Sequence, residues 1–132
     1  LAERRLYGAR ITPYILREWD RHQGSDRPSN KAEVEHMLPQ TASGKCWTDV
    51  WTPDEMVAKT NQIGNLTLLS EGMNRGLKNA CWDEKREKYR DESMYTSSRK
   101  IGQSVKEWTP AAHAKRTDQI TRWALKRWKS FR

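Results

Sequence analysis

The fold of this chain is decided by two stretches, VEHMLPQ at residues 34–40 and IGNLTLL at residues 63–69. Around the first, the side chains of residues 31–38 alternate between two faces, which is the pattern of a short strand that Pro39 would end. In the second, the apolar run at residues 66–69 is too short for a helix, so it predicts another strand. We therefore expect two strands joined by a long connection.

Three Thr-Pro pairs mark the starts of helices, at residues 12–13, 52–53 and 109–110. A threonine hydroxyl can accept a hydrogen bond from an unpaired amide at the N-cap, and proline lacks the amide that would be unpaired at the first helical position. Glu55 lies three residues after Thr52, so this pair also predicts a capping box. Each pair predicts a helix that begins there.

Other helices are expected around the two strands. Ser70 suits the N-cap of a helix that carries Asn74, and a polar helix is expected from about Trp82 to Asp91. The first helix should end near His22, before a polar loop at residues 24–30. The chain is thus expected to be α+β and predominantly helical, with the order strand, connection, strand, helix.

The composition favours a nucleic acid as the partner. Lys and Arg number 25 against 17 Asp and Glu, and the net charge of +8 attracts polyanions. Alternatively, the chain is a fragment that carries its share of the charge of a longer, balanced protein. No run of residues approaches the roughly 20 apolar residues that a bilayer demands, so we expect a soluble chain without a membrane partner. The length of 132 residues and the start at Leu1 predict a single domain from a longer protein.

The two cysteines, Cys46 and Cys81, are far apart and belong to no CxxC pair. We therefore expect neither a zinc knuckle nor a disulfide framework, which fits a reducing, cytoplasmic location. The seven tryptophans accompany a single phenylalanine, so they are expected to supply much of the apolar area of the core.

Three segments resemble the HNH nuclease motif: Glu35-His36, then Asn65, then Asn-Arg-Gly at residues 74–76. More closely, the chain resembles the C-terminal nuclease domain of GmrSD-type modification-dependent restriction enzymes, a family that includes SspE-type phosphorothioate-linked defence proteins. The resemblance continues through a set of later residues, Trp82, Lys85, Tyr89, Trp108, Thr109, Arg116 and Trp128.

This resemblance implies a fold, a role and a parent protein. The fold is a ββα-metal core, in which a two-stranded antiparallel hairpin packs with a helix, surrounded by additional helices. The role is DNA cleavage in a restriction or antiviral defence system. The parent protein would carry an N-terminal nucleotide-hydrolysing or sensing domain.

Hydrolysis of a phosphodiester needs a base that activates water and a group that neutralises the charge developing on the phosphate. Histidine titrates close to neutral pH, so we expect His36 to be the catalytic base. Mg²⁺ or Mn²⁺ prefers oxygen ligands, which Glu35 and Asn74 can supply. The resemblance implies that Asn65 orients the catalytic histidine or braces the two strands.

The role of Glu35 has several alternatives. A regular strand would point Glu35 and His36 to opposite faces, and a twist or bulge could reconcile them. Glu35 could then bind the metal directly, act through a water, or pair with a nearby arginine instead.

Basic side chains near the motif are candidates for contacts with DNA phosphates. Arg75 and Lys78 are expected on the same short helix as Asn74, and Arg116 on the last helix. Lys85 either reaches the DNA or braces its helix against the sheet.

Four other polar residues are left out of the expected site. Asn61 and Asn79 are expected at helix ends, where asparagine is commonly a cap. His22 and His113 are expected to be structural, because they lie at the end of the first helix and in the first turn of the last one.

The sequence thus predicts a metal-dependent endonuclease that nicks or cuts double-stranded DNA. Two alternatives are a DNA-binding module that has kept the ββα shape without turnover, and a ribonuclease, since the same chemistry acts on the phosphate of either nucleic acid. The presence of His36, Asn65 and Asn74 together favours the enzyme, because a binding module has no physical reason to carry all three.

Overall fold

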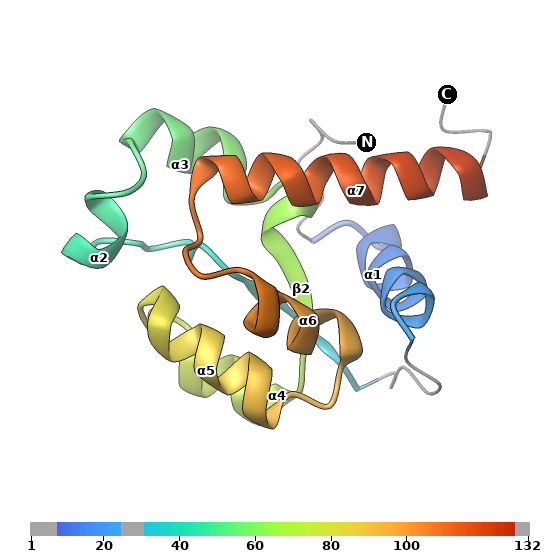
Figure 1. The fold of residues 1–132 in the computed structure, drawn as a ribbon. Coiled ribbons are helices and arrows are strands. Elements are labelled where there is room, and N and C mark those ends of the chain that lie inside the picture. The colour runs from blue at the N-terminus through green and yellow to red at the C-terminus, as the bar shows by residue number, and fades with distance from the viewer. Residues whose placement is uncertain (1–7, 25–30, 129–132) are drawn as a thin grey trace.

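The computed structural model describes residues 8–24 and 31–128, which form helices around a small sheet (Figure 1). The elements in chain order are α1 (Ile11–His22), β1 (Glu33–His36), α2 (Lys45–Thr48), α3 (Pro53–Lys59), the 3₁₀ turn η1 (Ile63–Asn65), β2 (Leu66–Leu69), α4 (Glu71–Leu77), α5 (Trp82–Glu92), α6 (Thr96–Ser104) and α7 (Pro110–Arg127). The expected α+β class with a predominance of helix is confirmed for this part of the chain.

The two strands form an antiparallel sheet in regular register, with Glu33 opposite Leu69 and His36 opposite Leu66. Both predicted strands are therefore confirmed, although β1 is shorter than the alternating pattern at residues 31–38. The connection between them contains α2, α3 and η1, so the sheet is not closed by a tight turn.

Both faces of β2 are buried, because helices cover the sheet from two sides. Leu66 and Leu68 point into a core cluster with Ile15 of α1 and Ile120 of α7. Leu69 points the other way, into a cluster that includes four tryptophans, Trp47, Trp51, Trp82 and Trp108. The expected role of tryptophan as the main large core residue is confirmed for these four.

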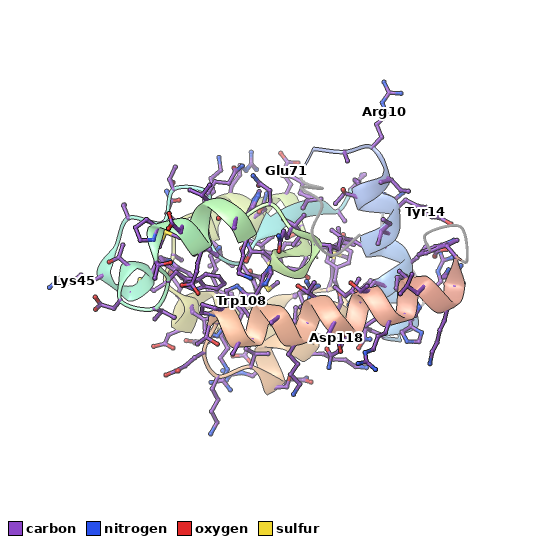
Figure 2. All side chains as sticks on the ribbon, turned by 90° about the horizontal axis from the view of Figure 1, so that it is seen from above. Arg10, Tyr14, Lys45, Glu71, Trp108 and Asp118 are labelled. Atoms are coloured by element: carbon purple, nitrogen blue, oxygen red, sulfur yellow. A yellow bond between two sulfur atoms is a disulfide. The ribbon has the colours of Figure 1, made fainter. Side chains whose placement is uncertain are left out.

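The views of the two figures place the elements around this core. Figure 2 shows α7, which carries Asp118, along one side, and Glu71 of α4 on the opposite side. Lys45 of α2 and Tyr14 of α1 lie at the two ends. Among the residues described, no helix is both long and apolar enough to cross a membrane.

Local capping chemistry explains the starts of three of the helices that the structure describes, α3, α4 and α7. The capping box of Thr52 and Glu55 is present, and the Ser70 and Thr109 hydroxyls accept hydrogen bonds from the backbone amides three residues later. The start predicted at Thr12 is wrong, because α1 begins at Ile11 without a side-chain cap and Thr12 is buried. The start of α6 has no side-chain cap, and its N-cap position is occupied by Tyr95.

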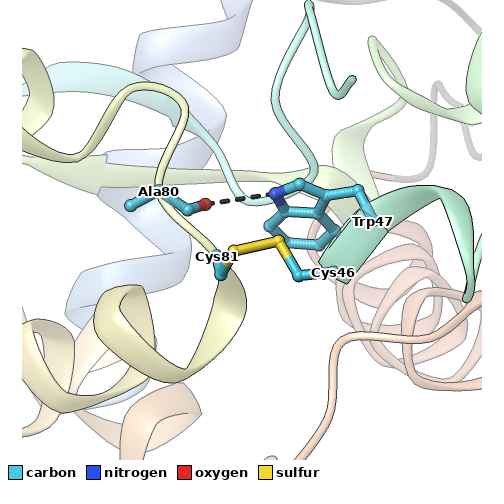
Figure 3. The surroundings of a disulfide bond; sticks show 4 residues. All are labelled: Cys46, Trp47, Ala80 and Cys81. Carbon is cyan, nitrogen blue, oxygen red and sulfur yellow. Dashed lines mark hydrogen bonds between the residues drawn. A yellow bond between two sulfur atoms is a disulfide. The ribbon is translucent and has the colours of Figure 1, made fainter. Parts of the chain in front are cut away.

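The two cysteines form a disulfide, contrary to the prediction from sequence. Cys46 of α2 is bonded to Cys81 at the N-terminus of α5, with Cα atoms 5.9 Å apart. Figure 3 shows a second contact between the same two segments, in which the Trp47 indole donates a hydrogen bond to the Ala80 carbonyl (3.1 Å). The pairing spans 35 residues and matches no local motif, so only the fold reveals it. The expectation of a reducing location was based on cysteines that form no disulfide, and the bond between Cys46 and Cys81 removes that support.

Arg116 fastens α7 to the segment before β2. Its Nη1 donates to the carbonyls of Ile63 (3.2 Å), Gly64 (3.0 Å) and Leu66 (2.7 Å). A Cβ at Gly64 would overlap the side chain of Thr117, so the close approach of α7 requires glycine there. Burial lowers the pKa of Arg116 to about 10, which still leaves the guanidinium charged at neutral pH. The prediction that Arg116 contacts DNA is wrong, because Arg116 is 6% exposed and its guanidinium group binds backbone carbonyls inside the protein.

His113 makes the stability of this fold depend on pH. His113 is 1% exposed, and its ring lies beside the rings of Trp51 and Trp108. Among the described residues, neither ring nitrogen has a hydrogen-bond partner. Burial lowers the pKa of His113 from 6.5 to about 4, and the positive charges of Lys59 and Arg116 add to the effect. Between these pH values the folded protein keeps the ring neutral, while the unfolded chain binds a proton.

We expect the free energy of unfolding to fall by about 3 kcal/mol as the pH is lowered from 6.5 to about 4, since one pKa unit corresponds to about 1.4 kcal/mol. Urea unfolding at a series of pH values measures this loss. His113→Phe places a ring that does not titrate at the same position, so the difference between the two proteins isolates the histidine. A difference that stays constant across the pH range contradicts the prediction.

Candidate active site

A pocket of about 250 Å³ opens where β1 ends beside α4. It is lined by Val34, Glu35, His36, Gln40, Thr41, Asn74, Lys78 and Asn79. Four residues that the sequence singled out, Glu35, His36, Asn74 and Lys78, are therefore brought to one place from two stretches of chain. Asn65, Arg75, Lys85 and Arg116 are not among the lining residues.

His36 is the last residue of β1 and is held from two sides. Its Nε2 lies 2.9 Å from Oδ1 of Asn61, and its backbone carbonyl accepts a hydrogen bond from Nζ of Lys85 (2.6 Å). Burial lowers the pKa of His36 below its ordinary value of 6.5, and the charge of Lys85 lowers it further, while the bond to Asn61 opposes both. The ring is therefore neutral at pH 7 and able to accept a proton.

Glu35 faces the opposite side of the strand from His36, as the regular register requires. Its Oε2 accepts hydrogen bonds from Nζ of Lys85 (3.0 Å) and from the hydroxyl of Tyr89 (2.8 Å), both on α5. Burial raises the pKa of Glu35 and lowers that of Lys85, whereas their mutual attraction opposes both shifts. The partner of the carboxylate is a lysine, and not the arginine that was considered from the sequence.

Lys85 was expected as a DNA contact or as a brace for its helix. Its side chain is fully buried, and its Nζ donates hydrogen bonds to two residues of β1, Glu35 and His36. The DNA contact is therefore a wrong prediction, because an ammonium group inside the core cannot reach a phosphate on the surface. The charge of Lys85 instead ties α5 to the residues at the centre of the candidate site.

Asn65 does not line the pocket, and its whole amide group forms hydrogen bonds to other parts of the chain. Its Oδ1 accepts from the backbone amide of Leu38 (2.8 Å) and from the Trp108 indole (2.9 Å). Its Nδ2 donates to the carbonyls of Leu38 (2.9 Å) and Thr60 (2.8 Å). None of these bonds goes to the ring of His36, so any effect of Asn65 on the histidine passes through the backbone.

Asn74 supplies an amide group to the pocket from α4. Its Nδ2 donates to Oε1 of Glu33 (3.2 Å), so its Oδ1 is the atom left for a cation. In residues 8–24 and 31–128, no three His, Cys, Asp or Glu side chains cluster into a metal site. Mg²⁺ usually keeps several waters and takes one or two protein carboxylates. The donor set of Glu35 and Asn74 fits a cation of this kind.

The family model for the C-terminal domain of GmrSD restriction endonucleases matches residues 2–123. The chain belongs to this family. No curated protein and no solved structure matched it. The match to the GmrSD C-terminal domain spans both strands, the pocket and most of α7.

In this GmrSD C-terminal domain, two cations remain on the surface near the pocket. Lys78 lines the pocket itself, directly after α4. Arg75 is exposed on α4 and forms a loose ion pair with Glu71 (3.3 Å), in which both side chains are more than half exposed. Their charges therefore face solvent, unlike those of Lys85 and Arg116.

Two asparagines of the GmrSD domain that were set aside as helix caps belong to the site. Asn61 contacts His36, and Asn79 lines the pocket while its Oδ1 accepts a hydrogen bond from Thr41 (2.9 Å). Asn61 is 25 residues from His36 in the chain, and no motif links them. No pattern in the sequence could have identified this contact.

Proposed function

We propose that this domain is a metal-dependent endonuclease of the HNH type, which hydrolyses phosphodiester bonds of double-stranded DNA in a restriction or antiviral defence system. The observation that carries the proposal is the neutral, buried imidazole of His36 in one pocket with the oxygen donors Glu35 and Asn74. Membership in the GmrSD C-terminal domain family supports a nuclease role. The sheet and α4 would then be the ββα core of such an enzyme.

In this proposal His36 takes a proton from the attacking water, as a general base. Glu35 and Asn74 would hold Mg²⁺ or Mn²⁺. Glu35 would hold the metal directly or through a water, while its Oε2 keeps the hydrogen bonds from Lys85 and Tyr89. The cation would neutralise the negative charge on the phosphate and the charge that develops on the departing oxygen.

The DNA backbone would be held by Lys78 at the pocket and by Arg75 on α4, with a general attraction from the net charge of +8. Contacts with the phosphates increase the affinity for DNA but do not distinguish one base sequence from another. A preference for modified DNA would therefore come from another part of the parent protein, which we propose to be an N-terminal nucleotide-hydrolysing or sensing domain.

The proposal is tested with supercoiled plasmid DNA incubated with the domain and Mg²⁺ or Mn²⁺. We expect open-circular or linear products, which EDTA abolishes and an excess of Mg²⁺ restores. A parallel reaction with structured RNA separates a deoxyribonuclease from a ribonuclease. Binding of plasmid without cleavage under all of these conditions would show a DNA-binding module and would overturn the proposal.

A further inference from the structure

The bond between His36 and Asn61 identifies which ring nitrogen carries the proton. The atom of Asn61 that faces Nε2 of His36 is Oδ1, at 2.9 Å. An amide oxygen only accepts hydrogen bonds, so Nε2 must be the donor. In a neutral imidazole one nitrogen is a donor and the other is a base, so the basic nitrogen of His36 is Nδ1.

The position of Asn61 is itself set by a second amide group. Asn61 follows Thr60, whose carbonyl accepts a hydrogen bond from Nδ2 of Asn65 (2.8 Å). The same side chain binds the amide and the carbonyl of Leu38, two residues after His36. Asn65 is fully buried, so it clamps the backbones that carry His36 and Asn61 in a fixed relation.

We propose that Asn61 is a positioning residue, which holds His36 in the tautomer protonated at Nε2 and so makes Nδ1 the atom that takes the proton from water. This inference rests on the proposed function, because it names the geometry of the base in that reaction. Asn65 acts on the histidine through Asn61 and the backbone, which gives a physical role to an asparagine that does not touch the ring.

The proton balance of the step is simple. One proton of the water moves to Nδ1, and the proton on Nε2 stays in its hydrogen bond to Asn61, so that the ring becomes an imidazolium. Asn61 gains and loses no proton. Its oxygen accepts a stronger hydrogen bond from the charged ring than from the neutral one, which stabilises the imidazolium as it forms.

The experiment measures the tautomer directly, by long-range ¹H–¹⁵N NMR of the imidazole nitrogens at pH 7.5. The signals of His36 are identified by their loss in His36→Ala. In the unaltered domain we expect one tautomer with the proton on Nε2. Asn61→Ala and Asn61→Leu remove the acceptor and should give a mixture of the two tautomers, whereas Asn61→Asp retains an acceptor oxygen and should preserve the original one.

The matched control is Gln62→Ala, which truncates the neighbouring amide side chain and should leave both the His36 signals and plasmid cleavage unchanged. In Asn61→Ala we expect kcat to fall about 10-fold with little change in KM, a part of the roughly 10²–10⁴-fold effect of a positioned base. Circular dichroism checks that each variant is folded.

Two results overturn the inference: a proton on Nδ1 in the unaltered domain, or identical His36 signals in the unaltered domain and both Asn61 truncations. Absence of cleavage by the unaltered domain would refute the nuclease proposal, while the NMR spectra would still decide the role of Asn61. The two failures are therefore distinguishable.

Discussion

His36→Ala is expected to leave supercoiled plasmid uncut under conditions in which the unaltered domain converts it to open-circular or linear DNA. A positioned general base contributes about 10²–10⁴-fold to the rate, and the proposed site offers His36 as that base. His36 is 8% exposed, and its backbone carbonyl can keep the hydrogen bond from Lys85 when the side chain is removed. The loss should therefore be one of chemistry, with the fold and the DNA affinity retained.

His22→Ala is a matched control for this prediction. His22 is an exposed residue at the end of α1, outside the pocket, and its ring packs against those of Trp19 and Trp123. We expect it to cut plasmid as the unaltered domain does. A gel-shift assay in EDTA measures binding without cleavage and should give similar affinities for all three proteins. Cleavage by His36→Ala at the unaltered rate would remove His36 from the mechanism.

Lys85→Met is expected to lower the free energy of unfolding by about 3–5 kcal/mol, which is the usual cost of breaking a buried ion pair by removing one partner. The substitution leaves the Glu35 carboxylate buried with Tyr89 as its remaining side-chain partner, and leaves the carbonyl of His36 without the ammonium group. Methionine fills much of the same volume, so the loss reflects charge and hydrogen bonding more than a cavity. Urea unfolding at pH 7 measures the change.

The same helix provides the control. Lys88 forms an exposed ion pair with Glu92, and Lys88→Met should leave the free energy of unfolding nearly unchanged. The double variant Glu35→Gln with Lys85→Met should recover part of the stability lost in Lys85→Met, because it no longer buries an unpaired carboxylate. Equal stability of Lys85→Met and Lys88→Met would show that the buried pair contributes nothing to the fold.

Local features of the fold were predictable because their causes are local. The capping box at Thr52 and the apolar run at residues 66–69 depend on neighbours within a few residues, and both are present as expected. The start of α1 was misplaced because Thr12 is buried in the core, and that burial depends on distant residues.

The charged residues show why the site was predicted only in part. A sequence shows that Lys85 and Arg116 are positive but does not show that they are buried. Arg116 was therefore expected to contact DNA, and Lys85 either to contact DNA or to brace its helix. In the fold, three carbonyls surround Nη1 of Arg116, and a carboxylate and a carbonyl bind Lys85. Arg75 and Lys78 carry the same kind of charge at exposed positions, and for them the assignment to DNA remains a prediction.

The contact between His36 and Asn61 lay beyond prediction for a related reason. Asn61 has the local environment of a residue that follows a helix, and its partner lies 25 residues earlier in the chain. The long connection between the strands brings the two residues together. The path of that connection in space cannot be predicted from the periodicity or spacing of residues in the sequence. The order of Glu35, His36 and Asn74 was informative because a resemblance to other proteins placed those residues in one site.

The bond between Cys46 and Cys81 closes a ring of chain with a sequence separation of 35 residues. The ring contains α3, η1, β2 and α4, and it also contains the asparagines at positions 61, 65, 74 and 79. A protease that cuts the backbone once inside this ring would leave both pieces covalently joined. The nicked molecule would run as one band on a gel until a reducing agent separated its halves.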